Sequence, residues 1–280
     1  MSLKMILKKI YLLSKKKEVI PILQPISESK ILYGKKALIV GGTGGIGSAI
    51  AKEFIRSGAH CIIAGTNKTK LEGMDLFSDT EFKNSAEPLV INLNDTSSFS
   101  QIFSKDSVIQ KCGEVDILVN AAGVHTEQVS FLGMTTEEYD RVMNINLRGV
   151  FFLCQAFSDY LIMNKKKGHI LLISSSRGSE PAWTPYGISK WALNGLTKGL
   201  AKELLPYGII VNAIAPGSTA TELLGKKSGD SIFTLDNGIN RLALPEEICT
   251  YAKFLVSDAG NMLVGETIHI SAGRGLFDVR

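Results

Sequence analysis

The stretch Ala37-Leu-Ile-Val-Gly-Gly-Thr-Gly-Gly-Ile-Gly47 decides the fold. Its first four residues are apolar, as in a short buried strand, and the helical pattern after it carries Ile50, Ala51 and Phe54. Glycines between a strand and a helix let the backbone turn tightly and approach a pyrophosphate, which the free amides and dipole of the helix N-terminus stabilise. A glycine-rich string alone indicates only a tight turn, but this position predicts a dinucleotide site.

Strand-like and helix-like segments alternate along the rest of the chain. The apolar stretches typical of strands are Ala37–Val40, Cys61–Ala64, Leu89–Ile91, Ile117–Val119, Ile170–Ile173, Ile209–Val211 and Thr267–Ile270. Long helical patterns separate several of them, notably Glu137–Tyr160 and Pro185–Leu205. Strands buried on both faces and separated by helices indicate a parallel sheet. With no repeat and no linker, we expect a single doubly wound, Rossmann-type α/β domain with a seven-stranded parallel sheet.

The positive charge of the chain is concentrated at its N-terminus. Residues 1–36 have a net charge of +7, whereas the whole chain has a net charge of only +4. Residues 37–280 therefore have a net charge of −3. A mildly acidic body argues against a nucleic-acid partner. We interpret residues 1–31 as a basic N-terminal extension and residues 32–280 as the Rossmann-type domain that contains the dinucleotide site.

The extension contains a stretch, Met5–Ser14, that mixes apolar and lysine positions as a short amphipathic helix does. Pro21 and Pro25 prevent such a helix from continuing. An arm that packs on a neighbouring subunit is the favoured interpretation, and contact with an anionic membrane surface is the alternative.

Cysteine spacing and hydropathy exclude other classes of protein. Cys61, Cys112, Cys154 and Cys249 are far apart and lie in or beside apolar stretches, so we expect buried thiols rather than disulfides. We expect no metal site, because neither the cysteines nor the histidines have ligand spacing. No run approaches the roughly 18 apolar residues of a membrane span. A cytoplasmic location is the default expectation.

Further motifs follow the glycine turn in a fixed order. They are Asn120-Ala-Ala-Gly123, Asn144-Ile-Asn-Leu147, Tyr186-Gly-Ile-Ser-Lys190 and Pro216-Gly217 with Thr221. Together with the Gly-x-x-x-Gly-x-Gly spacing of Gly41, Gly45 and Gly47, this set resembles the short-chain dehydrogenase/reductase family, in particular its 3-oxoacyl-carrier-protein reductases. The resemblance covers roughly residues 32–275. Two departures are Val40, where the family's motif begins with Thr, and Ser271-Ala-Gly, where the family usually has Asp-Gly-Gly.

The resemblance implies a nicotinamide dinucleotide cofactor. It assigns the cofactor to Gly41, Thr43, Gly45, Ile46, Gly47, Thr66, Asn67, Asn92, Leu93, Asn120, Ala121, Gly123, Tyr186, Lys190, Pro216, Gly217, Thr219 and Thr221. An acid at the end of the second strand would bind the ribose 2′-hydroxyl of NAD and repel the 2′-phosphate of NADP. Gly65 stands there instead, followed by Thr66-Asn67-Lys68. We therefore expect NADP, with NAD as the alternative, although Gly44 lies where NADP users of the family often have a basic residue.

Tyr186 and Lys190 are the central catalytic candidates. They lie four residues apart, so on a helix the two side chains share a face. A tyrosine titrates near 10 in water, and a neighbouring ammonium would lower that pKa toward a value suited to acid–base work. The resemblance implies that Lys190 also holds the nicotinamide ribose.

The resemblance adds two further catalytic residues. Asn146 would complete a proton relay through a water molecule, and Ser175 would orient the substrate oxygen. Ser174 is the alternative serine, because the interval from Ser175 to Tyr186 is shorter than in most of the family. His125 and Trp183 border the expected pocket, although simple packing or a loop role would also account for both.

These residues together predict an NADP-dependent enzyme that transfers a hydride between the nicotinamide and a small carbonyl or alcohol substrate. Both a 3-oxoacyl reductase and a sugar or polyol dehydrogenase remain open. A protein that binds NAD(P) and senses redox state without turnover is the non-catalytic alternative, and we would expect it to lack the tyrosine or the lysine. The resemblance also implies a homodimer or homotetramer, paired through the helices that contain Asn146 and Tyr186.

Overall fold

The computed structural model describes residues 30–104, 107, 109, 113–127, 130–221, 224, 225 and 230–277. The amphipathic stretch Met5–Ser14 and Cys112 lie outside these residues. Cys61, Cys154 and Cys249 are buried and unpaired.

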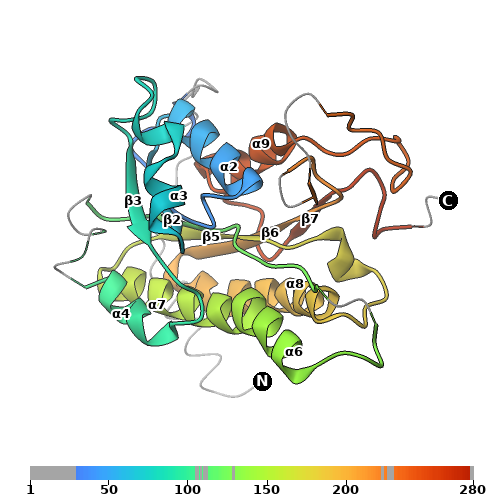
Figure 1. Cartoon of the computed structure of the whole chain (residues 1–280). Helices are drawn as coiled ribbons and strands as arrows, with labels where there is room; N and C mark the ends of the chain where they lie inside the picture. Colours follow the sequence, from blue (N-terminus) through green and yellow to red (C-terminus); the bar gives the residue numbers. More distant parts are fainter. Residues whose placement is uncertain are drawn as a thin grey trace, which may run out of the picture.

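Seven parallel strands form one sheet in the order β3-β2-β1-β4-β5-β6-β7 (Figure 1). The strands are β1 Lys36–Val40, β2 His60–Gly65, β3 Ala86–Val90, β4 Ile117–Asn120, β5 Gly168–Ile173, β6 Ile209–Pro216 and β7 Thr267–Ile270. The expected seven-stranded parallel sheet is confirmed. The order reverses between β1 and β4, the point at which open α/β sheets bind ligands.

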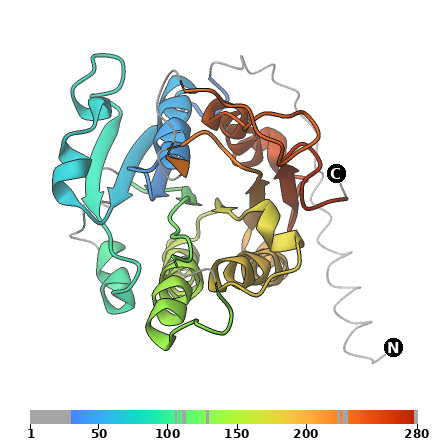
Figure 2. The same cartoon turned by 45° about the vertical axis from the view of Figure 1, so that its right-hand side comes forward.

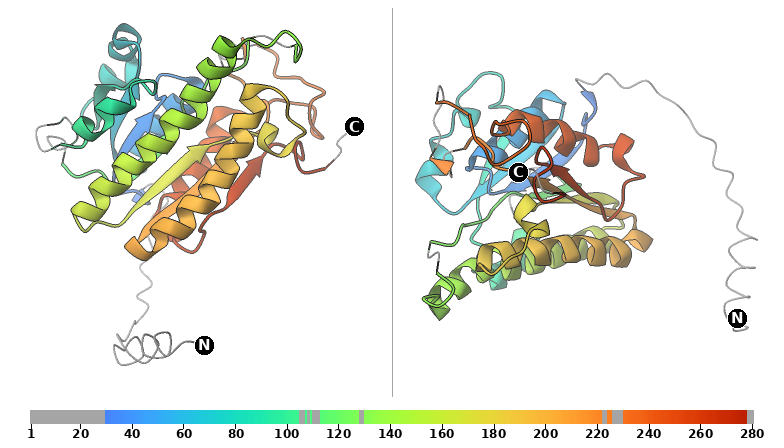
Figure 3. Two further views of the ribbon diagram at one scale, coloured as in Figure 1. Left: turned by 90° about the horizontal axis from the view of Figure 1, so that it is seen from below. Right: turned by 90° about the vertical axis from the view of Figure 1, so that its right-hand side faces the viewer.

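Helices cover both faces of the sheet (Figures 1 and 2). The α-helices are α2 Gly45–Arg56, α3 Lys68–Glu72, α4 Phe99–Ile102, α6 Thr136–Met143, α7 Gly149–Met163, α8 Pro185–Leu204 and α9 Pro245–Leu255. Helices α2 and α9 pack on one face, and α7 and α8 run side by side across the other (Figure 3). Within the described residues, none of these helices has the length and hydropathy to span a membrane.

The core follows from the two-residue alternation of buried strands. In β1, Leu38 and Val40 belong to the apolar cluster beneath α7 and α8, which includes Phe157. Ala37 and Ile39 belong to the cluster on the opposite face, which includes Phe54 of α2. Both faces of the central strands are therefore sealed, which leaves the carboxyl edge of the sheet for a site.

Two elements differ from the sequence-based expectation. The helical pattern Glu137–Tyr160 is not one α-helix, because a π-helical segment, η4 Asn144–Arg148, separates α6 from α7. Strand β3 begins at Ala86, before the expected Leu89, and contains Pro88. A proline is tolerated there because β3 is an edge strand that pairs with β2 alone, so its other side has no hydrogen-bond ladder that needs an N–H donor.

Candidate active site

The glycine turn between β1 and α2 forms an open cradle. Gly41 has φ +79°, in the left-handed region that favours glycine. A Cβ on Gly47 would collide with the Gly41 carbonyl oxygen, and one on Gly45 would lie 2.7 Å from Thr221 Cγ2. No described residue accepts a hydrogen bond from the amides of Gly45, Ile46 or Gly47, and no side chain caps α2. The turn therefore fits the pyrophosphate of a dinucleotide.

The end of β2 has no acidic residue. A Cβ on Gly65 would lie 2.8 Å from Thr43 Cγ2, so the threonine methyl fills the space that a larger residue would need. Thr66 and Asn67 are exposed, and Asn67 Oδ1 caps α3 by accepting from the Lys70 amide at 2.8 Å. Because no carboxylate points from this strand end, the pocket rim does not repel a phosphate.

Three further candidates for cofactor binding, Asn92, Leu93 and Asn120, lie at the ends of β3 and β4. Asn92 Oδ1 accepts from the Asn94 amide at 3.0 Å, and Leu93 is buried in the core, so both help to shape the loop. The buried Asn120 Oδ1 has no hydrogen-bond partner among the described residues. Such an orphaned acceptor suits a donor from a ligand.

Helix α8 begins immediately before Tyr186. Thr184 Oγ1 accepts from the Gly187 amide and Thr126 Oγ1 accepts from the Tyr186 amide, each at 3.1 Å, so side chains satisfy the first turn. The Lys190 ammonium lies 5.6 Å from the centre of the Tyr186 ring and donates to the Ile173 carbonyl at 2.9 Å. The two side chains share one face of the helix.

Electrostatics at Tyr186 differ from the sequence-based expectation. Burial raises the pKa of Tyr186, against the smaller lowering effects of a hydrogen bond with Ser175 and of the charges on Arg177 and Arg274. We expected Lys190 to lower this pKa, and that expectation is wrong. Burial raises the pKa by more than the opposing effects lower it, and the Lys190 ammonium donates to the Ile173 carbonyl instead. Burial also lowers the pKa of Lys190 to about 8.

The two candidate serines at the end of β5 have different partners. Ser175 lies near enough to Tyr186 to lower its pKa, and the Ser175 hydroxyl accepts from the Arg177 amide at 3.2 Å. The Ser174 hydroxyl donates instead to Asn194 Oδ1 at 2.6 Å, on α8. A short 3₁₀ turn, η5 Ser176–Ser179, follows at once and accounts for the short interval before Tyr186.

Asn146 joins the π-helical segment to the loop after β4. Its Oδ1 accepts from the Val124 amide at 2.8 Å, and its Nδ2 donates to the Val124 carbonyl at 2.9 Å and to Ser189 Oγ at 3.2 Å. A Cβ on the adjacent Gly123 would lie 3.4 Å from Asn146 Oδ1 and 3.5 Å from Lys190 Nζ. Asn146 and Lys190 therefore approach each other at Gly123, in the loop after β4.

One pocket brings together many of the candidates from distant parts of the chain. Those that line it are Ile46, Ala121, Gly123, Ser174, Ser175, Tyr186, Lys190, Pro216, Gly217, Thr219 and Thr221. Gly41, Thr43, Gly45, Gly47, Thr66, Asn67, Asn92, Leu93, Asn120 and Asn146 do not line it. The pocket also contains residues that the motifs did not indicate, including Arg177, Asp236 and Arg274. No sequence signal placed Arg274 here, because it belongs to the segment after the last strand.

His125 covers the tyrosine ring. The two rings stack at 4.2 Å between centres with 28° between their planes. Burial lowers the pKa of His125, helped by the charges of Lys190 and Arg177, so the imidazole is neutral at pH 7. Arg141 Nη2 donates to the His125 carbonyl at 2.8 Å, and its Nε is held by the buried Glu138 at 2.7 Å. This ion pair fixes the loop over the site.

Comparison with known proteins places the chain in a family. The short chain dehydrogenase family matches residues 35–231. The chain is also 35% identical over 248 residues to the 3-oxoacyl-[acyl-carrier-protein] reductase FabG of Thermotoga maritima, with 86% of this chain and 98% of the relative covered. The chain therefore belongs to the short-chain dehydrogenase/reductase family of NAD(P)-dependent oxidoreductases.

Two solved structures are similar throughout. A gluconate 5-dehydrogenase from Burkholderia cenocepacia, in complex with NADP and tartrate, is 29% identical with a TM-score of 0.78 and covers 89% of this chain and 99% of its own. A 3-ketoacyl-(acyl-carrier-protein) reductase from Brucella melitensis, complexed with NADH, is 28% identical with a TM-score of 0.76 and covers 88% and 100%. Relatives of this chain therefore bind either nicotinamide cofactor.

Proposed function

We propose that this protein is an NADP-preferring oxidoreductase that interconverts a carbonyl group and an alcohol on a small molecule. The observation that carries the proposal is that Tyr186, Ser175 and Lys190 line one pocket together with Ile46 of the glycine turn, with Ser175 near enough to Tyr186 to lower its pKa. When bound, the nicotinamide supplies or accepts the hydride. The protein supplies the proton, and a site for one carbonyl oxygen lies between the Tyr186 and Ser175 hydroxyls.

The residues divide the work as follows. Tyr186 donates its proton to the substrate oxygen in reduction and takes it back in oxidation, while Ser175 donates a hydrogen bond that orients that oxygen. A phenol titrates near 10 in water, so Tyr186 carries the proton that a donor must supply at neutral pH, and burial raises its pKa further. Lys190 holds the nicotinamide ribose hydroxyls, and Asn146 supports a water molecule that returns protons toward Lys190.

The preference for NADP rests on the end of β2. Gly65 presents no carboxylate, the Thr43 side chain fills the adjacent space, and Lys68 is exposed beside them. Lys68 is paired with the exposed Glu72 at 3.7 Å, but no carboxylate stands at the strand end itself, where an acid would bind the ribose 2′-hydroxyl of NAD and repel a 2′-phosphate.

The proposal is tested with a Tyr186→Phe variant. We expect turnover of a carbonyl panel with NADPH to fall about 1,000-fold, because proton transfer is lost, while NADPH binding by fluorescence titration stays unchanged. Tyr207→Phe, at an exposed tyrosine outside the pocket, is the matched control. Full activity in Tyr186→Phe would overturn the assignment. A wild-type protein that binds NADPH but turns over nothing in the panel would instead favour the redox sensor.

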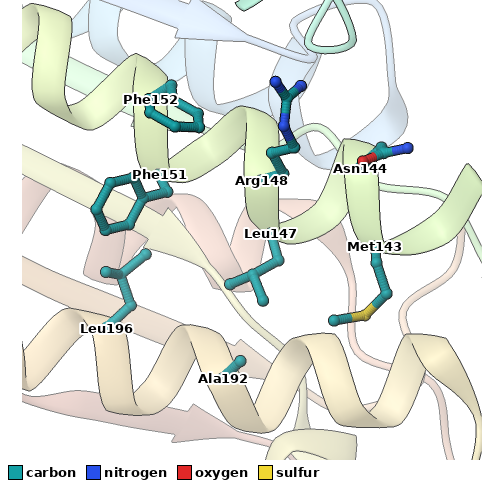
Figure 4. A pocket seen from close by; sticks show the side chains of 8 residues that line it. All are labelled: Met143, Asn144, Leu147, Arg148, Phe151, Phe152, Ala192 and Leu196. Carbon is teal, nitrogen blue, oxygen red and sulfur yellow. The ribbon is translucent and has the colours of Figure 1, made fainter. Parts of the chain in front are cut away.

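We also propose that α7 and α8 pair between subunits in a homodimer or homotetramer. An apolar groove runs between α8 and the helical stretch formed by α6, η4 and α7. Met143, Leu147 and Phe151 line it on one side and Ala192 and Leu196 on the other (Figure 4). Phe151 is 43% exposed and Trp191 50% exposed in the single chain. Large apolar side chains left exposed on a helix face are typical of a subunit interface.

Sedimentation velocity tests this pairing. We expect the wild type to sediment as a dimer or tetramer and Phe151→Glu to shift toward the monomer, because the carboxylate would be buried unpaired. Met163→Glu, at an exposed residue at the end of the same helix, should not. A monomeric wild type would rule out the interface.

A further inference from the structure

The pocket has a charged corner that the proposed hydride chemistry does not use. Arg177, Asp236 and Arg274 line it, and Glu180 lies between the two arginines. Glu180 Oε1 accepts from Arg274 Nε and its Oε2 accepts from Arg177 Nη1, both at 2.8 Å. We refer to these four residues as the charged corner.

The backbone fixes Arg274 in this corner. It follows β7 after a turn in which Ala272 and Gly273 have φ of 50° and 90°. Ser271 Oγ donates to the Arg274 carbonyl at 2.6 Å, which closes the turn. A Cβ on Gly275 would lie 2.6 Å from the Ser176 carbonyl oxygen, so the segment packs directly on the turn that follows Ser175. The guanidinium is therefore held in place, with its side chain only 17% exposed.

Arg274 retains a donor for a ligand. Its Nη1 contacts Ser218 Oγ at 2.9 Å and Asp236 Oδ2 at 3.2 Å. Its Nη2 has no partner among the described residues, and the same holds for Nη2 of Arg177. Because Nε and Nη1 are engaged, the donors left on this largely buried guanidinium are the N–H groups of Nη2, which suit a charged acceptor such as a carboxylate oxygen.

The charged corner is itself neutral, because the two arginines are balanced by the carboxylates of Glu180 and Asp236. What remains for a ligand is therefore the unused Nη2 of Arg274 and not a surplus of charge. Arg177 and Arg274 line the same pocket as Ser175 and Tyr186, so the corner and the proposed reacting group face one cavity.

We infer that the substrate carries a carboxylate, and that Arg274, assisted by Arg177, binds it while the reacting oxygen lies between Tyr186 and Ser175. The substrate class is therefore an oxo acid in reduction and the matching hydroxy acid in oxidation. The carbon skeleton lies against Trp183 and Pro181, which form the apolar part of the same pocket. This inference rests on the proposed function.

The test compares pairs of substrates that differ only in charge. The 2-, 3- and 4-oxo acids of four to eight carbons are assayed with NADPH beside their methyl esters, and the acid-to-ester ratio of kcat/KM is the readout. This ratio cancels any effect of Arg274 on Tyr186 itself. We expect at least one acid to exceed its ester, and Arg274→Gln to lower that ratio by about 30-fold, as the loss of a charge-assisted hydrogen bond does.

Two further variants separate recognition from folding. Arg274→Lys keeps the positive charge but loses the planar guanidinium donors. Its acid-to-ester ratio of kcat/KM should therefore fall between those of the wild type and Arg274→Gln. Glu180→Gln removes a competing carboxylate and should raise the ratio. Opposite effects of Arg274→Gln and Glu180→Gln cannot arise from general damage, because both remove a partner of the same ion pair. Equal ratios in all four proteins, or esters preferred by the wild type, would overturn the inference while leaving the proposed function intact.

Failure of the proposed function has a different signature. If no carbonyl compound is turned over with NADPH or NADH, calorimetric titration of succinate, its dimethyl ester and inorganic phosphate still decides the inference. Saturable binding of succinate alone, lost in Arg274→Gln, would support it. No succinate binding, or tighter binding of phosphate, would overturn it.

Discussion

Two parts of the candidate site are built in different ways: the glycine turn, which we propose holds the cofactor, and the charged corner of the pocket, which we propose binds the substrate. We call them the cofactor half and the substrate half. The cofactor half consists of backbone: a left-handed Gly41, a Gly47 with no room for a Cβ, and the free amides of α2. The substrate half consists of side chains, Arg177, Glu180 and Arg274, that come from turns after different strands and hold one another by ion pairs. A backbone site accepts one conserved ligand shape, whereas side chains on turns can be exchanged without disturbing the sheet. The comparison teaches that cofactor and substrate recognition can change independently here.

The largest effect should come from breaking the backbone half. Gly47→Val places methyl groups against the Gly41 carbonyl, so the turn must open and the amides lose their common direction. We expect NADPH affinity to fall by at least about 1,000-fold, the equivalent of several lost hydrogen bonds to a charged group. Gly44→Ala is the control, because its Cβ would meet only the Gly41 oxygen at 3.4 Å. Normal NADPH binding by Gly47→Val, measured by fluorescence titration, would contradict the backbone account.

The sheet beneath both halves should respond to acid. His169 in β5 is buried, its Nδ1 has no partner among the described residues, and burial lowers its pKa from 6.5 to about 4. The folded state therefore disfavours the protonated imidazole. The free energy of unfolding keeps its full value above pH 6.5 and decreases as the pH falls toward 4. Linkage gives a loss on the order of 3 kcal/mol. Urea unfolding at pH 7.0 and 4.5 measures it, and His169→Phe should flatten the difference.

Cofactor choice should shift by a smaller amount. Gly65→Asp, combined with Thr43→Ser to make room, adds a carboxylate near the expected 2′-phosphate. Repulsion of about 2 kcal/mol, for charges roughly 8 Å apart at an effective dielectric constant of 20, should weaken NADPH binding about 30-fold. Gly65→Asn in the same background separates charge from size. If the asparagine variant loses as much affinity as the aspartate variant, sterics and not charge set the preference.

The smallest effect should fall on the substrate half alone. Arg141→Gln removes both the hydrogen bond to the His125 carbonyl and the ion pair with Glu138, so the loop over Tyr186 loosens. We expect KM for the carbonyl substrate to rise about 10-fold, the cost of one charged hydrogen bond, with NADPH binding unchanged. Arg56→Gln removes a comparable but exposed pair with Glu81 and should change neither. A parallel loss of NADPH affinity in Arg141→Gln would show that the halves are coupled.

The same contrast explains what the sequence could predict. The glycine turn, the alternation of strands and the Tyr186–Lys190 spacing depend on local pattern, so the sheet and one face of α8 could be inferred from them. The direction of the Tyr186 pKa shift could not be inferred from the sequence, because it depends on burial by residues that only the fold brings together. The π-helical segment around Asn146 was also missed, since its apolar pattern continues that of α6 and α7. Arg274 was missed because ion pairs between turns leave no periodicity.

The packing of Gly275 on Ser176 has a consequence for mutagenesis. Gly275 has a positive φ and follows Arg274 directly, and both Arg274 and Ser176 line the pocket. A side chain at position 275 would push against the Ser176 carbonyl, so it would reshape the pocket wall without replacing any residue that lines it.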